Sequence, residues 1–325
     1  MVLLPSRVFR YHARRTTVYG CYMTLDDLRT IGVVGAGQMG RGISQVCASA
    51  GYRILLVDVS EPALEEAFKR IHGGVERAVE RGSLSSHQAG QVLALIHPIV
   101  QLDRLVEAQL VIEAIPEDLA LKEDLFVHLN RVCQPGTILA SNTSSISITK
   151  LGAASGRPDR VVGMHFMNPA PVMPLVEVVR GLETSEHTMK VVLELARQLG
   201  KVPVVCKDVP GFIVNRVLMP MINEAIFALE EGVASAEAID LAMTTGTNHP
   251  VGPLALADRI GLDTVLAICE VLHQDLGDPK FRPCPLLRRY VEAGWLGKKS
   301  GRGFYVYGET GQPTVVNVLP GEAER

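Results

Sequence analysis

Four polar residues lie within or at the end of apolar runs, where their side chains could reach a buried site: Ser144, His165, Glu177 and Asn215. Glu177 interrupts an apolar run, and a carboxylate there must be paired or protonated. An imidazole is a suitable partner, because a short proline-containing link would set His165 beside Glu177 on a neighbouring strand. The carboxylate would fix the tautomer, which makes the other ring nitrogen a general base for a substrate hydroxyl. From the spacing alone, a purely structural histidine remains open.

A row of hydroxyl and amide side chains, Ser-Asn-Thr-Ser-Ser, occupies residues 141–145 directly after an apolar run. If that run is a strand of a parallel sheet, the row lies at the carboxyl edge of the sheet, where ligands bind in such folds. Glu113 and Glu117 end the preceding apolar run and would share this edge. A helix cap, or a turn held by Ser and Thr side chains, is the structural alternative.

A Gly-x-Gly-x-x-Gly motif supplies a second candidate site. It comprises Gly35, Ala36, Gly37, Gln38, Met39 and Gly40. The motif follows a β-branched apolar run and opens a helical stretch, which is the context of a dinucleotide-binding turn. One glycine permits the tight turn, one lets the backbone approach a pyrophosphate, and one lets helix and strand pack closely. The helix N-terminus then offers free N–H groups to the phosphates.

The choice of cofactor depends on Asp58, which ends the next apolar run. A carboxylate there can accept hydrogen bonds from both ribose hydroxyls and would repel a 2′-phosphate. The following residues, Val59 and Ser60, supply no arginine for such a phosphate, so the sequence predicts NAD rather than NADP. The alternative is that Asp58 only caps a helix and the glycines only form a turn.

Alternating short apolar runs and helical stretches hold these residues up to about residue 206. The predicted strands cover residues 31–35, 53–57, 110–114, 137–140, 161–166 and 175–179. The predicted helices cover residues 39–50, 61–81, 85–95 and 121–132, the last of them opened by Pro116. This order predicts an α/β, Rossmann-type domain with an open, mostly parallel sheet and helices on both faces.

Strand patterns almost vanish after Pro210, and the sequence predicts a smaller all-helical domain there. Its helical stretches cover residues 214–229, 235–243, 263–274 and 285–293. We expect the Rossmann-type domain at 28–206, the helical domain at 207–310 and a tail at 311–325. Residues 1–27 are expected to form a disordered N-terminal extension. Its first 22 residues contain arginines and no acid, so they could be a mitochondrial-type presequence, but an upstream start with Met23 opening the protein is favoured.

The composition excludes several classes of protein. Of 325 residues, 47% are hydrophobic and 21% charged, which is too apolar for a disordered chain. The net charge of −3 gives no basic excess to hold nucleic acid, and no apolar run reaches the roughly 20 residues of a membrane-spanning helix. Six cysteines without Cys-x-x-Cys spacing predict neither a metal site nor a disulfide framework. The expected location is the cytoplasm, or the mitochondrial matrix if residues 1–22 are a presequence.

Several longer stretches resemble the 3-hydroxyacyl-CoA dehydrogenase family, especially its bacterial members that act on 3-hydroxybutyryl-CoA. These stretches are VGAGQMGRGISQV, VIEAIPEDLALKEDLF, ASNTSSISIT, GMHFMNPAPVMPLVEVV, KDVPGFIVNRVLMPMINEA, HPVGPLALADRIGLD and GKKSGRGFYVY. They cover almost all of residues 29–308, in the family's order. The resemblance implies NAD-dependent oxidation of short-chain (S)-3-hydroxyacyl-CoA to 3-oxoacyl-CoA and its reverse, with a homodimer formed through the helical domain.

The resemblance also implies individual roles. His165 matches the general base, Glu177 its orienting acid, and Ser144 the serine that hydrogen-bonds the substrate's 3-oxygen near the nicotinamide. Asn215 matches an asparagine that helps to hold the acyl group. Further positions match residues around the nicotinamide half of the cofactor: Glu117, Lys122, Asn142 and Asn168.

The helix after Asp58 should meet the CoA moiety, although Gly74 stands where a small hydrogen-bonding residue is expected. Basic residues of this helix could meet CoA phosphates or simply form a solvated face: Lys69, Arg70, Arg77 and Arg81.

Three other functions remain as alternatives. A Ser-His-Glu hydrolase would lack the Gly-x-Ser-x-Gly motif around its serine and would leave the dinucleotide site without a use. A dehydrogenase of the 6-phosphogluconate type would need a catalytic lysine on the long helix after Pro210, which has Asn215 and Arg216 but no lysine through Glu231. A catalytically idle NAD-binding protein would not need the intact set of polar residues described first.

Overall fold

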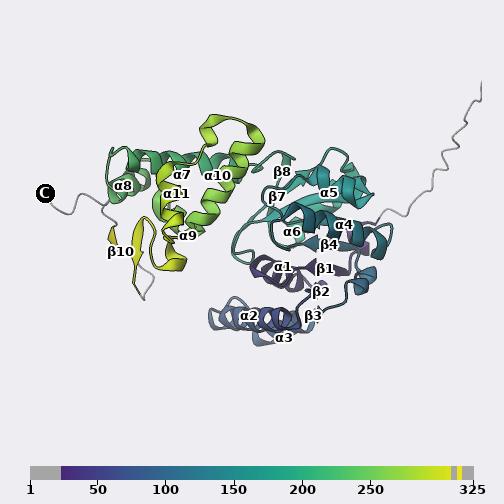
Figure 1. Ribbon diagram of the computed structural model, residues 1–325. Coiled ribbons are helices and arrows are strands. Elements are labelled where there is room, and N and C mark those ends of the chain that lie inside the picture. The colour runs from purple at the N-terminus through teal and green to yellow at the C-terminus, as the bar shows by residue number, and fades with distance from the viewer. Residues whose placement is uncertain (1–22, 309–312, 317–325) are drawn as a thin grey trace, which may run out of the picture.

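The computed structural model describes residues 23–308 and 313–316 of the chain (Figure 1). Residues 1–22 and most of the expected tail lie outside this part. Within the expected N-terminal extension, Leu25–Asp27 forms a short 3-10 helix and Met23 is buried. The prediction of disorder up to residue 27 is therefore wrong for these residues, because the apolar side chain of Met23 packs into the core of the sheet domain.

An eight-stranded sheet forms the first domain, in the order β3-β2-β1-β4-β5-β6-β7-β8. Its strands are β1 (Thr30–Val34), β2 (Arg53–Val57), β3 (Ile96–Ile99), β4 (Leu110–Glu113), β5 (Ile138–Ser141), β6 (Val161–Phe166), β7 (Leu175–Arg180) and β8 (Val202–Lys207). Every neighbouring pair is parallel except β6 and β7, which are antiparallel. The predicted mostly parallel sheet is confirmed.

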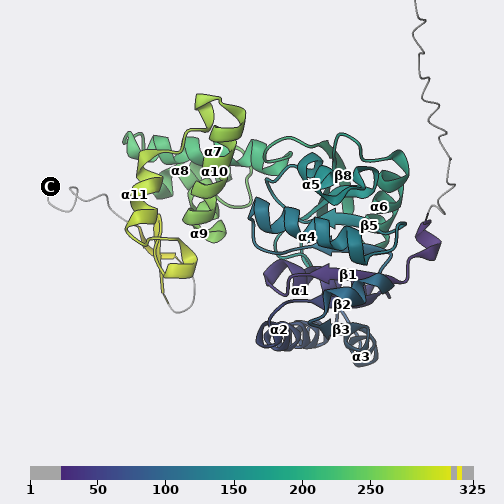
Figure 2. The ribbon, with the colours of Figure 1, turned by 45° about the vertical axis from the view of Figure 1, so that its right-hand side comes forward.

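Helices cover both faces of this sheet, as Figures 1 and 2 show. They are α1 (Gln38–Ser49), α2 (Glu61–Glu80), α3 (Ser86–Ala94), α4 (Leu119–Val132), α5 (Ile148–Ser155) and α6 (Glu186–Gln198). One buried cluster joins the sheet to α1, α2, α3 and α6, and a second cluster joins it to α4 and α5. Helix α4 begins at Leu119 rather than at Pro116, because the Asp118 side chain caps it by accepting from the Leu121 amide.

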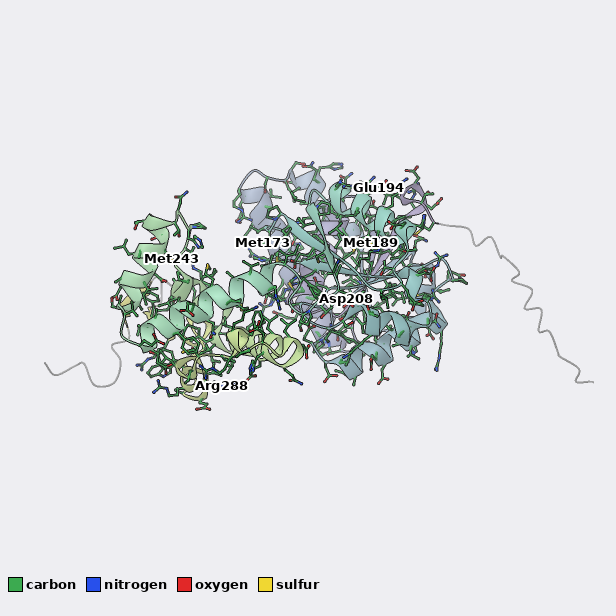
Figure 3. All side chains as sticks on the ribbon, turned by 90° about the horizontal axis from the view of Figure 1, so that it is seen from above. Met173, Met189, Glu194, Asp208, Met243 and Arg288 are labelled. Atoms are coloured by element: carbon green, nitrogen blue, oxygen red, sulfur yellow. The ribbon has the colours of Figure 1, made fainter. Side chains whose placement is uncertain are left out.

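The second part of the chain is built mainly from helices around its own buried cluster. They are α7 (Val214–Glu230), α8 (Ala236–Gly246), α9 (Pro253–Ile260), α10 (Leu262–Leu276) and α11 (Pro285–Glu292). The predicted helical domain is confirmed, but it ends in an antiparallel ribbon of β9 (Tyr305–Tyr307) and β10 (Pro313–Val316) that the sequence pattern did not indicate. Figure 3 places Met243 and Arg288 on this part and Asp208 on the sheet domain.

Two buried carboxylates fasten the ribbon to the helices. Asp258, in α9, accepts hydrogen bonds from the Phe304 and Tyr305 amides at 3.0 Å and from the Tyr307 hydroxyl at 2.9 Å. Asp240, in α8, accepts from the Tyr305 hydroxyl at 2.7 Å and from two amides at the start of α9. The stretches HPVGPL and GKKSGRGFYVY are therefore held together by these two carboxylates.

The link between the two domains is held by Asp208, directly after β8. Its carboxylate accepts from the Ser147 hydroxyl at 2.8 Å and from the Ile148 and Thr149 amides at 2.9 and 2.8 Å. These amides open α5, where a carboxylate is favoured by the helix dipole. Strand β8 itself continues through Lys207, and Asp208 follows it directly.

Candidate active site

The glycine motif forms the turn between β1 and α1. Gly35 has φ +104°, and a Cβ there would lie 2.5 Å from the Ala114 carbonyl oxygen. A Cβ on Gly40 would collide with the Gly35 carbonyl oxygen, so the third glycine permits the close packing of α1 on the turn. Gly37 has no atom within 4 Å of the place a Cβ would occupy, which leaves the backbone open to a ligand. The three glycines show the separate tasks that a dinucleotide turn requires.

Asp58 lies at the carboxyl end of β2 and faces the same turn. Its carboxylate accepts a hydrogen bond from the Ala36 amide at 2.8 Å and another from the Ser60 amide at 3.1 Å. It therefore braces both the glycine turn and the start of α2. A cavity of about 710 Å³ opens here, lined by the turn, Asp58, Met39 and the residues after β4. Its size, its open backbone and its carboxylate fit the adenosine and pyrophosphate parts of NAD.

The expected pairing of His165 and Glu177 is confirmed. Because β6 and β7 are antiparallel, their register sets His165 directly opposite Glu177. The imidazole Nδ1 lies 2.7 Å from Glu177 Oε2, and the two residues are only 8% and 0% exposed. The Phe212 ring packs against the imidazole with the ring centroids 5.7 Å apart. Nδ1 is thus occupied by the carboxylate, which leaves Nε2 for other partners.

Glu177 has a second set of partners across the domain boundary. Its Oε1 accepts hydrogen bonds from the Ile213 and Val214 amides, both at 2.9 Å, at the start of α7. Burial alone would raise the pKa of Glu177, but the bonds to His165 and to these amides outweigh it and hold the pKa below its usual value. Asn215 is the second residue of α7, directly after Val214, so this carboxylate also fixes the backbone next to Asn215.

Several groups of the turn after β5 donate hydrogen bonds to a single carboxylate oxygen. Glu117 Oε1 accepts from the Thr143 hydroxyl at 2.6 Å and from the Ser144 and Ser145 amides at 3.0 and 3.1 Å. Thr143 also accepts from the Ser145 amide, which is the side-chain-held turn that the sequence left as an alternative. Asn142 accepts from the Phe166 amide at 2.9 Å and so ties this turn to the residue after His165.

The remaining sequence-predicted cofactor residues also lie at this edge. Lys122 is only 1% exposed, and its ammonium lies 3.3 Å from Glu117 Oε2. Gln38 opens α1, and its amide donates to Asn168 Oδ1 at 2.9 Å in the loop after β6. The candidate residues therefore form two groups, one around the glycine turn and one around the ends of β5, β6 and β7.

Ser144 and Asn215 do not bind His165 directly. In the part of the chain that the structure describes, no hydrogen bond joins either of them to His165. Ser144 is tied to Glu117, and Asn215 follows two amides that donate to Glu177. Phe212 was missed by sequence reasoning, and the Pro-Gly-Phe string before α7 was its only signal. Asp208 was missed as well, because its role as a cap depends on contacts with residues far away in the sequence.

A basic cavity of about 490 Å³ lies between α1, α2 and the loop after β6. It is lined by the predicted Lys69, Arg70 and Arg77, whereas Arg81 does not line it. Arg41 in the first turn of α1 lines both this cavity and the one beside the glycine turn, and sequence reasoning missed it. A Cβ on Gly74 would meet the Gln45 side-chain oxygen at 3.2 Å, so Gln45 offers a polar group where Gly74 offers none.

Two further findings concern residues 23–308 and 313–316. Within these ranges, no group of three or more His, Cys, Asp or Glu side chains could hold a metal ion. No helix in them is both long and apolar enough to cross a membrane.

Known proteins match the chain over nearly its whole described length. The model of the "3-hydroxyacyl-CoA dehydrogenase, NAD binding domain" matches residues 30–209, and that of the "3-hydroxyacyl-CoA dehydrogenase, C-terminal domain" matches residues 211–307. A probable 3-hydroxybutyryl-CoA dehydrogenase of Bacillus subtilis is 56% identical over 87% of this chain and 99% of its own length. A similar protein of Deinococcus radiodurans is 54% identical over 85% of this chain and 99% of its own length.

A solved structure shows the same arrangement. The crystal structure of (S)-3-hydroxybutyryl-CoA dehydrogenase from Ralstonia eutropha matches with a TM-score of 0.84 and 49% identity, over 87% of this chain and 100% of that one. The hydrolase and the 6-phosphogluconate-type interpretations do not agree with these matches. The chain belongs to the 3-hydroxyacyl-CoA dehydrogenase family, whose first domain binds NAD.

Proposed function

We propose that the protein catalyses the NAD-dependent oxidation of short-chain (S)-3-hydroxyacyl-CoA to 3-oxoacyl-CoA, and the reverse reaction. The single observation that carries this proposal is the buried His165–Glu177 pair, at the same edge of the sheet as the dinucleotide turn. The names of the relatives in Bacillus subtilis and Ralstonia eutropha support 3-hydroxybutyryl-CoA and acetoacetyl-CoA as the substrates.

His165 acts as the general base in the oxidative direction. Glu177 occupies Nδ1, so Nε2 accepts the proton of the substrate's 3-hydroxyl. Bound NAD would accept the hydride from C3 of the substrate. The Glu177 carboxylate stabilises the imidazolium that forms and holds the ring in place. In the reductive direction the same imidazolium returns the proton, and help of this kind is worth roughly 10²–10⁴ in rate.

Ser144 and Asn215 position the reacting group. The Ser144 amide donates to Glu117 Oε1 at 3.0 Å, and the Ser144 hydroxyl donates to the same oxygen at 3.4 Å. This hydroxyl lies near the end of β5, and it would turn from Glu117 to hydrogen-bond the substrate's 3-oxygen. Asn215 follows the amides held by Glu177 and helps to hold the acyl group. Because each residue is anchored by a carboxylate of the sheet domain, both approach the substrate from fixed backbone.

The cofactor residues follow the same division. The glycine turn, with Gly35, Gly37 and Gly40 and the side chains of Gln38 and Met39, binds the pyrophosphate half of NAD. Asp58 accepts from the ribose hydroxyls and disfavours NADP. The residues proposed to surround the nicotinamide half are Glu117, Lys122, Asn142, Ser144 and Asn168.

The acyl-CoA substrate enters beside α2. We infer that its phosphates meet the basic cavity lined by Arg41, Lys69 and Arg77, with Gln45 supplying the polar contact that Gly74 lacks. An Arg77→Ala variant should raise KM for acetoacetyl-CoA by a fewfold and leave kcat unchanged. Equal KM values in both proteins would contradict this placement.

The helical part is proposed to form a homodimer. Apolar side chains of α7 and α8, Val217 and Leu241, are 67% and 62% exposed and would be covered by a second copy. Light scattering that gives the mass of one chain would contradict the dimer. We also propose a division into domains at the link after β8, and a cytoplasmic location, which the free thiols of the five described cysteines support.

The first experiment measures loss of NADH absorbance with acetoacetyl-CoA, beside the same assay with NADPH. Rapid turnover with NADH and much slower turnover with NADPH is expected, because Asp58 repels a 2′-phosphate. An Asp58→Ala variant should narrow the difference between the two cofactors. Bound NADH without turnover of acetoacetyl-CoA would contradict the proposed reaction and favour an idle NAD-binding protein.

A further inference from the structure

A buried carboxylate without an assigned task lies at the carboxyl end of β4, a central strand of the sheet. Glu113 is the last residue of β4, between Val34 of β1 and Ser141 of β5, and it is 0% exposed. Burial raises the pKa of this carboxyl, although the Lys122 ammonium and the Ser141 hydroxyl oppose the rise. A carboxylate is costly at such a place, so its partners indicate what it does.

The first set of contacts leads directly to the turn after β5. The Ser141 hydroxyl donates to Glu113 Oε2 at 2.6 Å and accepts from the Thr143 amide at 3.2 Å. Because a hydroxyl has only one hydrogen, donation to Glu113 orients its lone pairs toward the amide. Glu113 thereby fixes the first hydrogen bond of the turn that carries Ser144.

The second set leads to the same turn from its other side. The Lys122 ammonium lies 2.5 Å from Glu113 Oε1 and 3.3 Å from Glu117 Oε2. Lys122 therefore pairs with one oxygen of Glu117, and the other oxygen accepts hydrogen bonds from the Thr143 hydroxyl and the Ser144 amide. Both sets of contacts begin at Glu113 and end at the residues around Ser144.

We propose that Glu113 is a positioning residue, which sets the Ser144 turn through Ser141 on one side and through Lys122 and Glu117 on the other. This inference rests on the proposed function for its effect on turnover. Without the charge of Glu113, the buried Lys122 ammonium keeps one carboxylate instead of two. It is then drawn toward Glu117 and weakens the hold of Glu117 on the turn.

A double-mutant cycle tests the proposal through turnover. Glu113→Gln should lower kcat about tenfold or more, since small displacements of a positioned group cost rates of this order. In a Ser144→Ala background the same substitution should lower kcat by less than threefold, because the positioned hydroxyl is already gone. An equal loss of kcat in both backgrounds would overturn the proposal.

Two further variants separate positioning from folding. Thr137→Val removes a buried hydrogen bond at the opposite end of β5, from the Thr137 hydroxyl to the Ala108 carbonyl, and serves as the matched control. It should lower the melting temperature and leave kcat unchanged. If Glu113→Gln does not fold, Ser141→Ala breaks one set of contacts alone, and its loss of kcat should likewise vanish when Ser144 is absent.

Amide hydrogen exchange tests the same proposal without turnover. In Glu113→Gln, the amides of Thr143, Ser144 and Ser145 should exchange at least tenfold faster than in the wild type, and in Thr137→Val they should not. Unchanged exchange at these amides would overturn the positioning role. A wild type that fails to turn over acetoacetyl-CoA would contradict the proposed function and leave the exchange result to decide this proposal.

Discussion

Both parts of the molecule bury carboxylates, but they give them different partners. At the edge of the sheet, Glu113 and Glu117 lie beside the Lys122 ammonium, and Glu177 lies beside the His165 imidazole. In the helical part, Asp240 and Asp258 are held by backbone amides and tyrosine hydroxyls. The first group faces side chains that carry or can accept a positive charge, and the second group faces neutral donors.

The difference is visible in the ionisation of these groups. The pKa values of Glu117 and Glu177 are lowered overall. Burial alone would raise them, but the hydrogen bonds and the basic partners of the two carboxylates have the larger effect. Burial raises the pKa of Asp258 to about 6, and the amides and Tyr307 do not compensate for it. Glu113 differs from the other two glutamates, because burial raises its pKa more than the Lys122 ammonium lowers it. The partners of Glu117 and Glu177 therefore favour the charged form, whereas burial disfavours the charge on Glu113 and Asp258.

The largest effect is expected from His165→Ala, which removes the group that gives the sheet edge its chemistry. It should lower kcat with acetoacetyl-CoA by roughly 10²–10⁴ and leave the Kd for NADH nearly unchanged. Steady-state kinetics and NADH fluorescence measure the two quantities. His128→Ala, which replaces an exposed histidine on α4, is the control and should retain full activity. If His165→Ala lowers kcat only slightly, the carboxylates at the sheet edge have no catalytic role that distinguishes them from those of the helical part.

The next effect concerns the pH dependence of stability in the helical part. The pKa of Asp258 is raised from 3.8 to about 6, so the folded state holds its proton at a pH where the unfolded state has lost it. The resulting stabilisation is complete below the unfolded pKa and is lost as the pH rises through the folded one. Relative to Asp258→Asn, the wild type should lose about 2 kcal/mol of unfolding free energy between about pH 4 and pH 7.

Urea unfolding of the two proteins across this pH range measures the difference. Parallel curves for the wild type and Asp258→Asn would show that Asp258 titrates alike in both states. That result would contradict the raised pKa of Asp258, and with it the comparison.

The smallest effects come from a matched pair, Glu177→Gln and Asp240→Asn. In Glu177→Gln an amide replaces the charge that faces the imidazolium, and losing a charge-assisted hydrogen bond of about 1.5–3 kcal/mol lowers kcat roughly 10- to 100-fold. In Asp240→Asn one accepting oxygen becomes an amide nitrogen, which cannot accept from Tyr305 or from the first amides of α9. This lowers the free energy of unfolding by about 1–3 kcal/mol and leaves kcat unchanged. Steady-state kinetics and urea unfolding of both variants should show the loss of kcat in Glu177→Gln, and the loss of stability with unchanged kcat in Asp240→Asn.

Sequence reasoning found most of the candidate site because its signals are local. The glycine motif, Asp58, and a carboxylate within the apolar run of β7 each indicate a task without knowledge of distant contacts. The antiparallel direction of β7 could not be read from the run itself. It follows from the short link after β6, and it is what brings Glu177 opposite His165.

Two missed strands and one missed ion pair share a physical cause. Strand β3 contains His97 and Pro98 and lies at the edge of the sheet, so it lacks the apolar pattern of a buried strand. Strand β8 lies at the other edge and exposes its valines. The pairing of Lys122 with Glu113 was also out of reach, because it joins a helix to a strand end through side chains alone. Edge strands and buried ion pairs depend on the assembled sheet.

The carboxylate of Glu177 serves two structures at once, the imidazole of the sheet domain and the first amides of α7. Its negative charge is shared between them, so a change at one oxygen alters the attraction at the other. Moving α7 away would leave Oε1 of a buried carboxylate without its two amide donors. The orientation of the imidazole and the position of the helical domain therefore depend on the same side chain.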